Sequence, residues 1–228
     1  MLAVAACSSP DTGGNGKAEP AGVAANADKP VGAATSIPAA DSKFIVVFGD
    51  SLFAGYNLGA DEGFAPALER VLNAAGTKAS VFNAGVSGDT TAAGAQRLAF
   101  TLDGLPRKPD LVIVGLGGND MLRGLDAAQT RQNLESIVAQ LKQRGIAVML
   151  SGMVAAPNLG PDYAAEFNPI YADLARKHDL PLYPFFLDGV ITDRSLMLPD
   201  GIHPNANGVE VVAGRMEPLV RRSVTARD

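Results

Sequence analysis

At 228 residues the chain is long enough for one domain with a substantial buried core. Its 19 basic and 24 acidic residues give a net charge of −5, and the sequence has no basic stripe of the kind that binds nucleic acid. It also has no apolar run long enough to span a bilayer, and a single cysteine excludes an internal disulfide and a multi-cysteine metal site. We expect a monomer that holds no metal and needs no cofactor.

The N-terminal segment resembles a bacterial lipoprotein signal, in which the peptide is cut before a cysteine whose thiol is acylated. Val4-Ala5-Ala6-Cys7 matches this pattern. Residues 1–7 are thus expected to be a signal remnant and anchor, and residues 8–42, rich in Ala, Gly and Pro, a disordered tether. Only six residues precede Cys7 and none is basic, so either translation starts upstream or the match is fortuitous. An anchor at Cys7 would place the protein in the periplasm or cell envelope, joined to a membrane through lipid alone.

From Lys43 onward, continuous apolar runs alternate with segments of helical periodicity. Runs that are apolar at every position are typical of parallel strands covered on both faces. Five such runs are predicted strands: Phe44–Phe48, Ala79–Asn83, Leu111–Leu116, Ile146–Leu150 and Leu182–Tyr183.

Helical spacing of apolar side chains predicts four helices, near residues 64–76, 126–145, 168–178 and 209–219. Asp126, with Gln129 three residues on, and Asn168, which precedes a proline, are predicted N-terminal caps. Gly76 and Gly145 are predicted stops. The alternation predicts a three-layer α/β/α sandwich over residues 43–228 with a mostly parallel sheet. Ligands of such sheets bind outside the carboxyl ends of the strands.

Polar, glycine-bearing segments follow four of the predicted strands, so the fold would bring them to one edge of the sheet. They are Gly49-Asp50-Ser51-Leu52, the segment 83–90 that contains Gly88, Gly117-Gly118-Asn119-Asp120, and Asp200-Gly201-Ile202-His203-Pro204.

Ser51 and His203 together predict nucleophilic catalysis. A serine hydroxyl needs a neighbouring base to take its proton, and a carboxylate on the other imidazole nitrogen fixes the tautomer. His203 lies three residues after Asp200, whereas the other histidine, His178, ends a basic helix and is not expected to be catalytic. We therefore predict a serine hydrolase.

The four segments, in this order, resemble the sequence blocks of the SGNH (GDSL) hydrolases, and the resemblance extends from about Lys43 to the C-terminus. It is closest to the bacterial arylesterase and multifunctional acyl-CoA thioesterase/lysophospholipase branch, to which residues 116–124 and 182–186 are also similar. The resemblance implies a flavodoxin-like fold and an acyl-enzyme on Ser51, with His203 as base and Asp200 as its partner. It also implies Ser51, Gly88 and Asn119 as donors of an oxyanion hole. The implied substrates are small aryl or acyl esters, with thioesters and lysophospholipids as further candidates.

Three more carboxylates adjoin these blocks. Asp50 is expected to hydrogen-bond backbone around the Ser51 turn, and Asp89 and Asp120 are expected to be structural rather than catalytic.

Specificity is less evident in the sequence. Apolar side chains that follow the third and fourth strands would either border an acyl chain or pack the loops: Met121, Leu122, Leu125 and Pro157.

Other functions remain open. A carbohydrate acetyl esterase of the cell envelope is the first alternative, and a non-enzymatic envelope lipoprotein is another. A metal-dependent phosphoesterase is disfavoured, because its ligands would have to be a single histidine and scattered carboxylates, namely Asp50, Asp120, Asp200 and His203.

Overall fold

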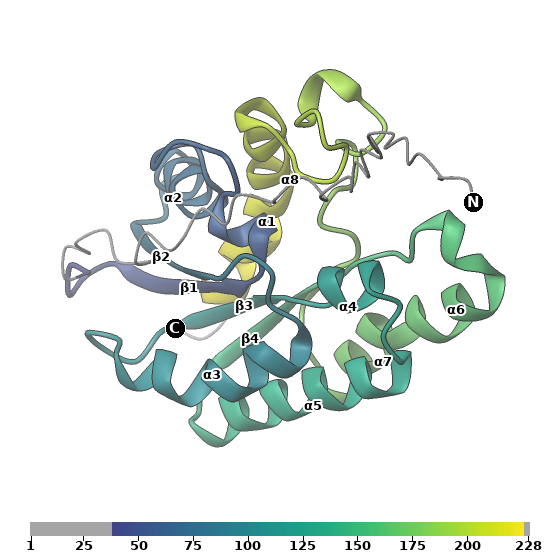
Figure 1. The fold of residues 1–228 in the computed structure, drawn as a ribbon. Helices are drawn as coiled ribbons and strands as arrows, with labels where there is room; N and C mark the ends of the chain where they lie inside the picture. The colour runs from purple at the N-terminus through teal and green to yellow at the C-terminus, as the bar shows by residue number, and fades with distance from the viewer. Residues whose placement is uncertain (1–37, 226–228) are drawn as a thin grey trace, which may run out of the picture. The chain divides into compact units, whose positions relative to one another are not determined.

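The computed structural model describes residues 38–225, in which five strands form one sheet between two layers of helices (Figure 1). All strand pairs are parallel, and the order across the sheet is β2-β1-β3-β4-β5. The strands are β1 (Lys43–Gly49), β2 (Ala79–Gly85), β3 (Leu111–Gly115), β4 (Ala147–Ser151) and β5 (Leu182–Tyr183). The predicted α/β sandwich with a parallel sheet is confirmed.

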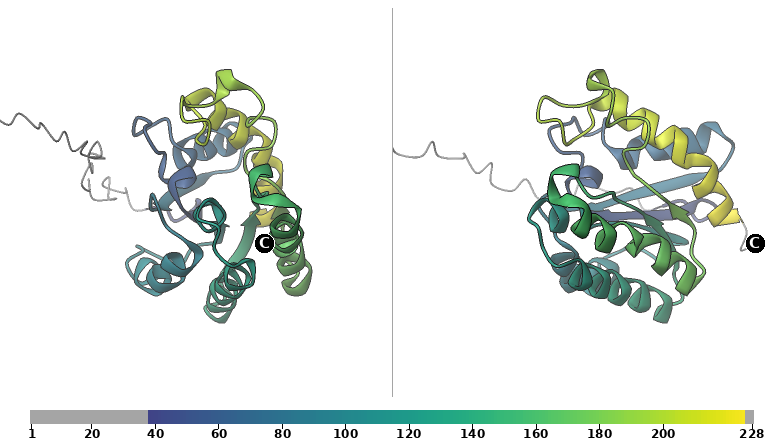
Figure 2. Two further views of the ribbon diagram at one scale, coloured as in Figure 1. Left: turned by 45° about the vertical axis from the view of Figure 1, so that its right-hand side comes forward. Right: turned by 90° about the vertical axis from the view of Figure 1, so that its right-hand side faces the viewer.

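Alternate side chains of β1 explain why residues 44–48 of this strand are all apolar. Phe44, Val46 and Phe48 face the helices α3 (Thr91–Asp103), α5 (Ala127–Gln143) and α7 (Pro169–His178). Ile45 and Val47 face α2 (Phe64–Ala74) and α8 (Ala206–Thr225) on the other side of the sheet. Figure 2 shows these two helix layers from further directions. Both faces of the strand are therefore covered by helices, and each position from Phe44 to Phe48 is buried and apolar.

Short helices occupy the carboxyl edge of the sheet. α1 (Ser51–Ala54) and α4 (Gly118–Leu122) start where β1 and β3 end, and α6 (Gly160–Phe167) leads into α7. Two 3₁₀ turns cover Pro157–Leu159 and Arg194–Leu196. The sequence analysis did not predict α1, α3, α4 or α6, because they are short or, like the first turns of α3, built of small residues with no apolar stripe.

The two predicted caps behave differently. Asp126 caps α5 as expected, because its carboxylate accepts from the N–H groups of Ala128 at 2.7 Å and Gln129 at 3.4 Å. Asn168 does not cap α7: its own backbone is helical, and its Oδ1 accepts from the Ala155 N–H at 2.8 Å. The prediction for Asn168 was wrong because α6 continues almost directly into α7, which leaves its side chain to hold the loop after β4.

The topology creates a crevice at the centre of the sheet. The chain leaves β1 for β2 on one side and returns through α3 to β3 on the other side. Connections from neighbouring strands thus diverge at the carboxyl ends of β1 and β3, where open α/β sheets bind ligands.

None of the helices between residues 38 and 225 is long and apolar enough to cross a membrane. Cys7 and residues 8–37 of the predicted tether lie outside the described residues.

Candidate active site

Ser51 is the first residue of α1, immediately beyond the end of β1. Asp50 creates this turn as the N-cap of α1, and its Oδ1 accepts from the Leu52 N–H at 3.1 Å, as the sequence predicted. Only 2% of Asp50 is exposed, and this burial, together with the charges of Asp89 and Asp120, outweighs the Leu52 hydrogen bond and raises the Asp50 pKa to about 7.

His203 lies between Ser51 and Asp200, although Ser51 is 152 residues distant in sequence. Its Nε2 is 2.8 Å from Ser51 Oγ, and its Nδ1 is 2.8 Å from Asp200 Oδ2. The other oxygen of Asp200 accepts from the backbone N–H groups of Ile202 at 2.9 Å and His203 at 3.0 Å. Partial burial raises the pKa of Asp200, but these hydrogen bonds and the His203 ring outweigh it, so that its pKa lies below the ordinary value.

Tyr56 covers the face of the His203 ring, with centroids 4.4 Å apart and ring planes at 30°. Tyr56 lies outside the predicted motifs and was missed. Nothing in its sequence neighbourhood signals a contact with a residue so far along the chain.

Two further candidate donors, Gly88 and Asn119, follow β2 and β3 in the chain, and of these Asn119 lines the cavity described below. Gly88 has a φ of +86°, a left-handed conformation that favours glycine. Asn119 is the second residue of α4, and one N–H of its side-chain amide donates to the Asp89 carbonyl at 2.9 Å. Among residues 38–225, neither the Ser51 N–H nor the Gly88 N–H has a protein acceptor. The two N–H groups and the second N–H of the Asn119 amide are therefore available as donors.

Gly117 sets the direction in which α4 begins. Its φ is +112°, and a Cβ at this position would lie 2.2 Å from Tyr171 Oη. The Tyr171 hydroxyl is buried and donates to the Leu116 carbonyl at 2.7 Å. Only glycine therefore fits at the point where the chain turns from β3 into the helix that carries Asn119.

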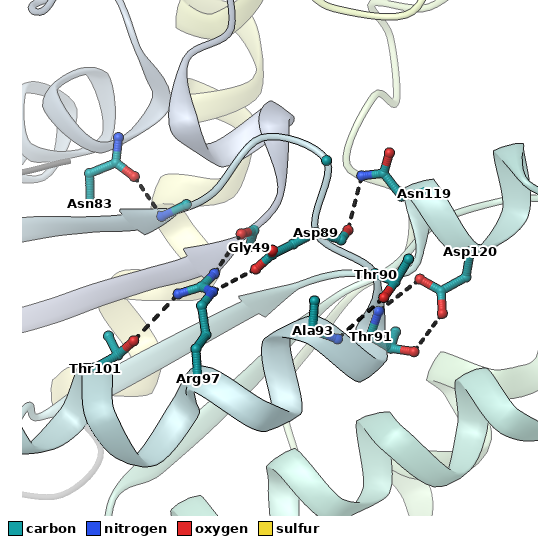
Figure 3. Close-up of polar contacts among 12 residues, drawn as sticks. Gly49, Asn83, Asp89, Thr90, Thr91, Ala93, Arg97, Thr101, Asn119 and Asp120 are labelled. Atoms are coloured by element: carbon teal, nitrogen blue, oxygen red, sulfur yellow. Dashed lines mark hydrogen bonds and ion pairs between the residues drawn. The ribbon is translucent and has the colours of Figure 1, made fainter. Parts of the chain in front are cut away.

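Asp89 and Asp120 hold the surrounding loops (Figure 3). Asp120 accepts from the Thr91 N–H at 2.8 Å, from Thr91 Oγ1 at 2.5 Å and from Thr130 Oγ1 at 3.3 Å. Asp89 pairs with Arg97, with 2.5 Å between Oδ2 and Nε. Neither carboxylate lines the cavity, which agrees with the structural roles predicted for them.

A cavity of about 460 Å³ opens beside Ser51 and His203. Met121, Leu122 and Pro157 line it, which is one of the two arrangements that the sequence left open for them. Leu125 is not among the lining residues, which differs from the prediction. α4 ends at Leu122, and Gly124, with a φ of +60°, turns the chain away before Leu125 is reached.

Much of the cavity wall was not predicted. Its residues come from loops distant in sequence, and an isolated apolar residue in a loop is indistinguishable in the sequence from one that packs the core. They are Met153, Phe185, Leu187 and Ile191, whereas Ile202, which also lines the cavity, adjoins His203 in a predicted segment. The lining is therefore mostly apolar around a few polar groups, a typical composition for a small-molecule site.

The residues suggested for a phosphoesterase metal site do not form one ligand set. Asp200 and His203 contact each other and Ser51, while Asp120 bonds two threonines. In the described part of the chain, no three His, Cys, Asp or Glu side chains are grouped as a metal ion would require. His178 lies at the C-terminus of α7, 3.5 Å from Glu135, and does not line the cavity.

Residues 47–211 match the profile of the GDSL-like lipase/acylhydrolase family. The chain belongs to this family. It is 40% identical over 165 residues to esterase TesA of Pseudomonas aeruginosa PAO1, with 72% of this chain and 81% of the relative covered. It is 38% identical over 186 residues to thioesterase 1/protease 1/lysophospholipase L1 of Escherichia coli K12, with 80% and 87% covered.

Solved structures of similar proteins agree with this assignment. AlinE4, an SGNH-hydrolase family esterase, has a TM-score of 0.69 at 50% identity, covering 80% of this chain and 96% of its own. The crystal structure of TesA has a TM-score of 0.74 at 36% identity, covering 79% and 99%. The present GDSL-family chain is thus a serine ester hydrolase, and the sequence-based assignment to the SGNH hydrolases is confirmed.

Proposed function

We propose that Ser51 is the acylated nucleophile, His203 the general base and Asp200 the group that orients His203. The observation that carries this proposal is the pair of 2.8 Å contacts on the two ring nitrogens of His203. With Nδ1–H donating to Asp200, Nε2 is left as an acceptor for the Ser51 hydroxyl proton. Tyr56 and Asp200 together restrict the ring to one orientation.

Acyl transfer then follows in two steps. Ser51 Oγ attacks the ester carbonyl carbon as its proton passes to His203 Nε2, and the carbonyl oxygen becomes negative. The tetrahedral species collapses when Nε2 returns the proton to the leaving alcohol, which leaves an acyl ester on Ser51. Water repeats the sequence on this ester, releases the acid and restores the free serine.

The negative oxygen of these intermediates would be bound by three donors: the N–H groups of Ser51 and Gly88 and the Asn119 amide. Fixed donors directed at a developing charge in a dry site stabilise the transition state more than the ground state. Support comes from their free N–H groups and from the Asp89 carbonyl, which orients the Asn119 amide through its other N–H.

The substrate proposed is an ester whose acyl part is apolar. Support comes from the apolar side chains that line the cavity, including Met121, Leu122 and Pro157. A carbohydrate acetyl esterase would need polar partners for sugar hydroxyls along that wall, so this alternative is disfavoured. Aryl esters, acyl thioesters and lysophospholipids fit the class, and relatives carry the names arylesterase and thioesterase 1/protease 1/lysophospholipase L1.

We further propose that the enzyme works as a monomer in the cell envelope or periplasm, anchored by lipid on Cys7 and joined to the domain by residues 8–42. The lipobox-like Val4-Ala5-Ala6-Cys7 segment supports this arrangement. Mass spectrometry of the envelope fraction from cells expressing the native gene should find an acylated Cys7, and Cys7→Ser should release the protein. An unmodified Cys7 in that fraction would contradict the anchor.

The catalytic assignment is tested by Ser51→Ala on chromogenic esters of graded acyl length. We expect kcat to fall by about 10³-fold or more for every ester, with the melting temperature unchanged, because the nucleophile alone is removed. Ser87→Ala, at the neighbouring serine of the Gly88 segment, is the matched control and should retain activity. A Ser51→Ala enzyme with more than a tenth of the native kcat would overturn the assignment.

A further inference from the structure

Arg97 is a largely buried cation on α3, beside the loop that carries Asp89 (Figure 3). Its side chain is 20% exposed, and each nitrogen of the guanidinium has a partner. Nε lies 2.5 Å from Asp89 Oδ2, Nη2 donates to the Gly49 carbonyl at 3.0 Å, and Nη1 lies 3.4 Å from Thr101 Oγ1.

Two of these partners lie in different parts of the site: Gly49 precedes the proposed nucleophile, and Asp89 lies in the loop with the proposed oxyanion donor Gly88. Gly49 is the last residue of β1 and stands two positions before Ser51. Asp89 directly follows Gly88, and its carbonyl accepts from the Asn119 amide. The Arg97 guanidinium therefore connects the end of β1, which leads to Ser51, with Asp89. Asp89 in turn adjoins Gly88 and accepts from Asn119, the other two proposed oxyanion donors.

An aromatic contact also restricts the orientation of the guanidinium plane. Its central carbon lies 4.1 Å from the centroid of the buried Phe48 ring, so that the aromatic ring stacks against the cation. A planar fork with directed N–H groups can hold two acceptors at a set separation, whereas a lysine ammonium is a point charge on a flexible stem. A positive charge alone would therefore not hold the Asp89 carboxylate and the Gly49 carbonyl at a fixed separation.

We infer that Arg97 is a positioning residue for ester hydrolysis, which sets the spacing between Ser51 and the donors Gly88 and Asn119. This inference rests on the proposed function. Arg97 is not a catalytic residue, because its side chain does not line the cavity. Donors stabilise an oxyanion only when they are preorganised, and a misplacement of about 1 Å can cost about 100-fold in rate.

Arg97→Lys tests the inference, because it keeps the positive charge and removes the fork. We expect kcat to fall by about 10- to 100-fold while KM stays within about twofold, since the donors act on charge that exists in the transition state. The matched control is Arg131→Lys, at an ion pair with Asp173 of 2.9 Å that joins α5 to α7 away from the cavity. Arg131→Lys should keep the native kcat, and circular dichroism should show both variants folded.

A double-mutant cycle separates positioning from a general effect on stability. In an Asn119→Ala background, Arg97→Lys should lower kcat by less than about threefold, because one donor that it positions is already absent. Multiplicative losses, or a native kcat for Arg97→Lys alone, would overturn the inference and leave the oxyanion assignment standing. A native kcat for Asn119→Ala alone would instead overturn that assignment, and the inference with it.

Asp89→Asn alters the Arg97–Asp89 ion pair from the carboxylate side. This variant tests the inference even if Arg97→Lys does not fold. The amide keeps an oxygen acceptor for Arg97 but loses the ion pair, so kcat should fall by about 3- to 10-fold at unchanged KM. A kcat equal to that of the native enzyme would overturn the inference.

Discussion

The turn that carries Asp200 and His203 is held by hydrogen bonds between residues two to five apart, on the exposed side of the site. The loop that carries Gly88 is held by contacts that span 30 residues to Asn119, 35 to Arg123 and 48 from Arg97 to Gly49. We call these the acid–base side (Asp200 and His203) and the oxyanion side (Gly88, Asp89 and Asn119). A local turn can form its geometry from its own sequence, whereas the oxyanion side exists only when three strands are already assembled.

The largest effect is expected on the acid–base side, for Asp200→Asn. The amide would direct an N–H₂ group at His203 Nδ1, favour the other tautomer and leave Nε2 unable to accept the Ser51 proton. We expect kcat to fall by up to about 10⁴-fold with the free energy of unfolding changed by less than about 0.5 kcal/mol. Steady-state kinetics and urea unfolding measure the two quantities. A loss below about tenfold would mean that Asp200 does not set the tautomer.

On the oxyanion side, Asn119→Ala should lower kcat by about 10²–10³-fold with little change in KM. Asn119 would act on charge that is absent from the ground state, so substrate affinity should be spared. Asn73→Ala is a suitable control, because the Asn73 amide bonds the Glu69 and Ala79 carbonyls away from the cavity. A raised KM with native kcat would make Asn119 a substrate-binding residue instead.

The free energy of unfolding should also distinguish Asp120, which anchors the start of α3 beside the oxyanion side, from the local turn of the acid–base side. Asp120→Ala removes the acceptor of a buried Thr91 N–H and hydroxyl, and should lower the free energy of unfolding by about 3 kcal/mol. Urea unfolding of Asp120→Ala beside Asp200→Asn compares a long-range anchor with a local turn. Equal stabilities for the two variants would contradict the contrast between the sides.

The smallest effect concerns the pH dependence of stability at Asp50. Its pKa rises on folding from 3.8 to about 7, so the folded state holds a proton that the unfolded state has lost, and stability falls as pH rises through that window. Asp50→Asn removes this dependence. Relative to the native protein, the variant should gain about 1 kcal/mol in free energy of unfolding between pH 5 and pH 6, as measured by urea titration. A constant difference between the two proteins would show that folding does not raise the pKa of Asp50.

The sequence predicted the sheet because its five apolar runs are continuous. It predicted Ser51, Asp200 and His203 as a group because a serine nucleophile needs a base, and a histidine base needs a carboxylate partner. It did not predict α3, whose first turns are small residues, nor Arg97 on it. The role of an arginine depends on which carbonyl and carboxylate the fold brings to it, and those partners lie 48 and 8 residues away.

The cavity wall shows the same limit. Met121 and Leu122 lie two and three residues after Asn119, so their place at the wall could be inferred from the motif. Leu187 and Ile191 come from a loop whose path is set by packing against other elements, and no local pattern marks them. Asn168 failed as a predicted cap for a related reason, because its distant partner, the Ala155 N–H, could not be read from the sequence.

The central claim is that the acid–base and oxyanion sides meet at one nucleophile, Ser51. It is tested most directly by reaction with a serine-reactive phosphonate and peptide mapping of the labelled protein. We predict one adduct, on Ser51, with complete loss of esterase activity at one label per chain. An adduct on another residue, or full activity in the labelled protein, would contradict the claim.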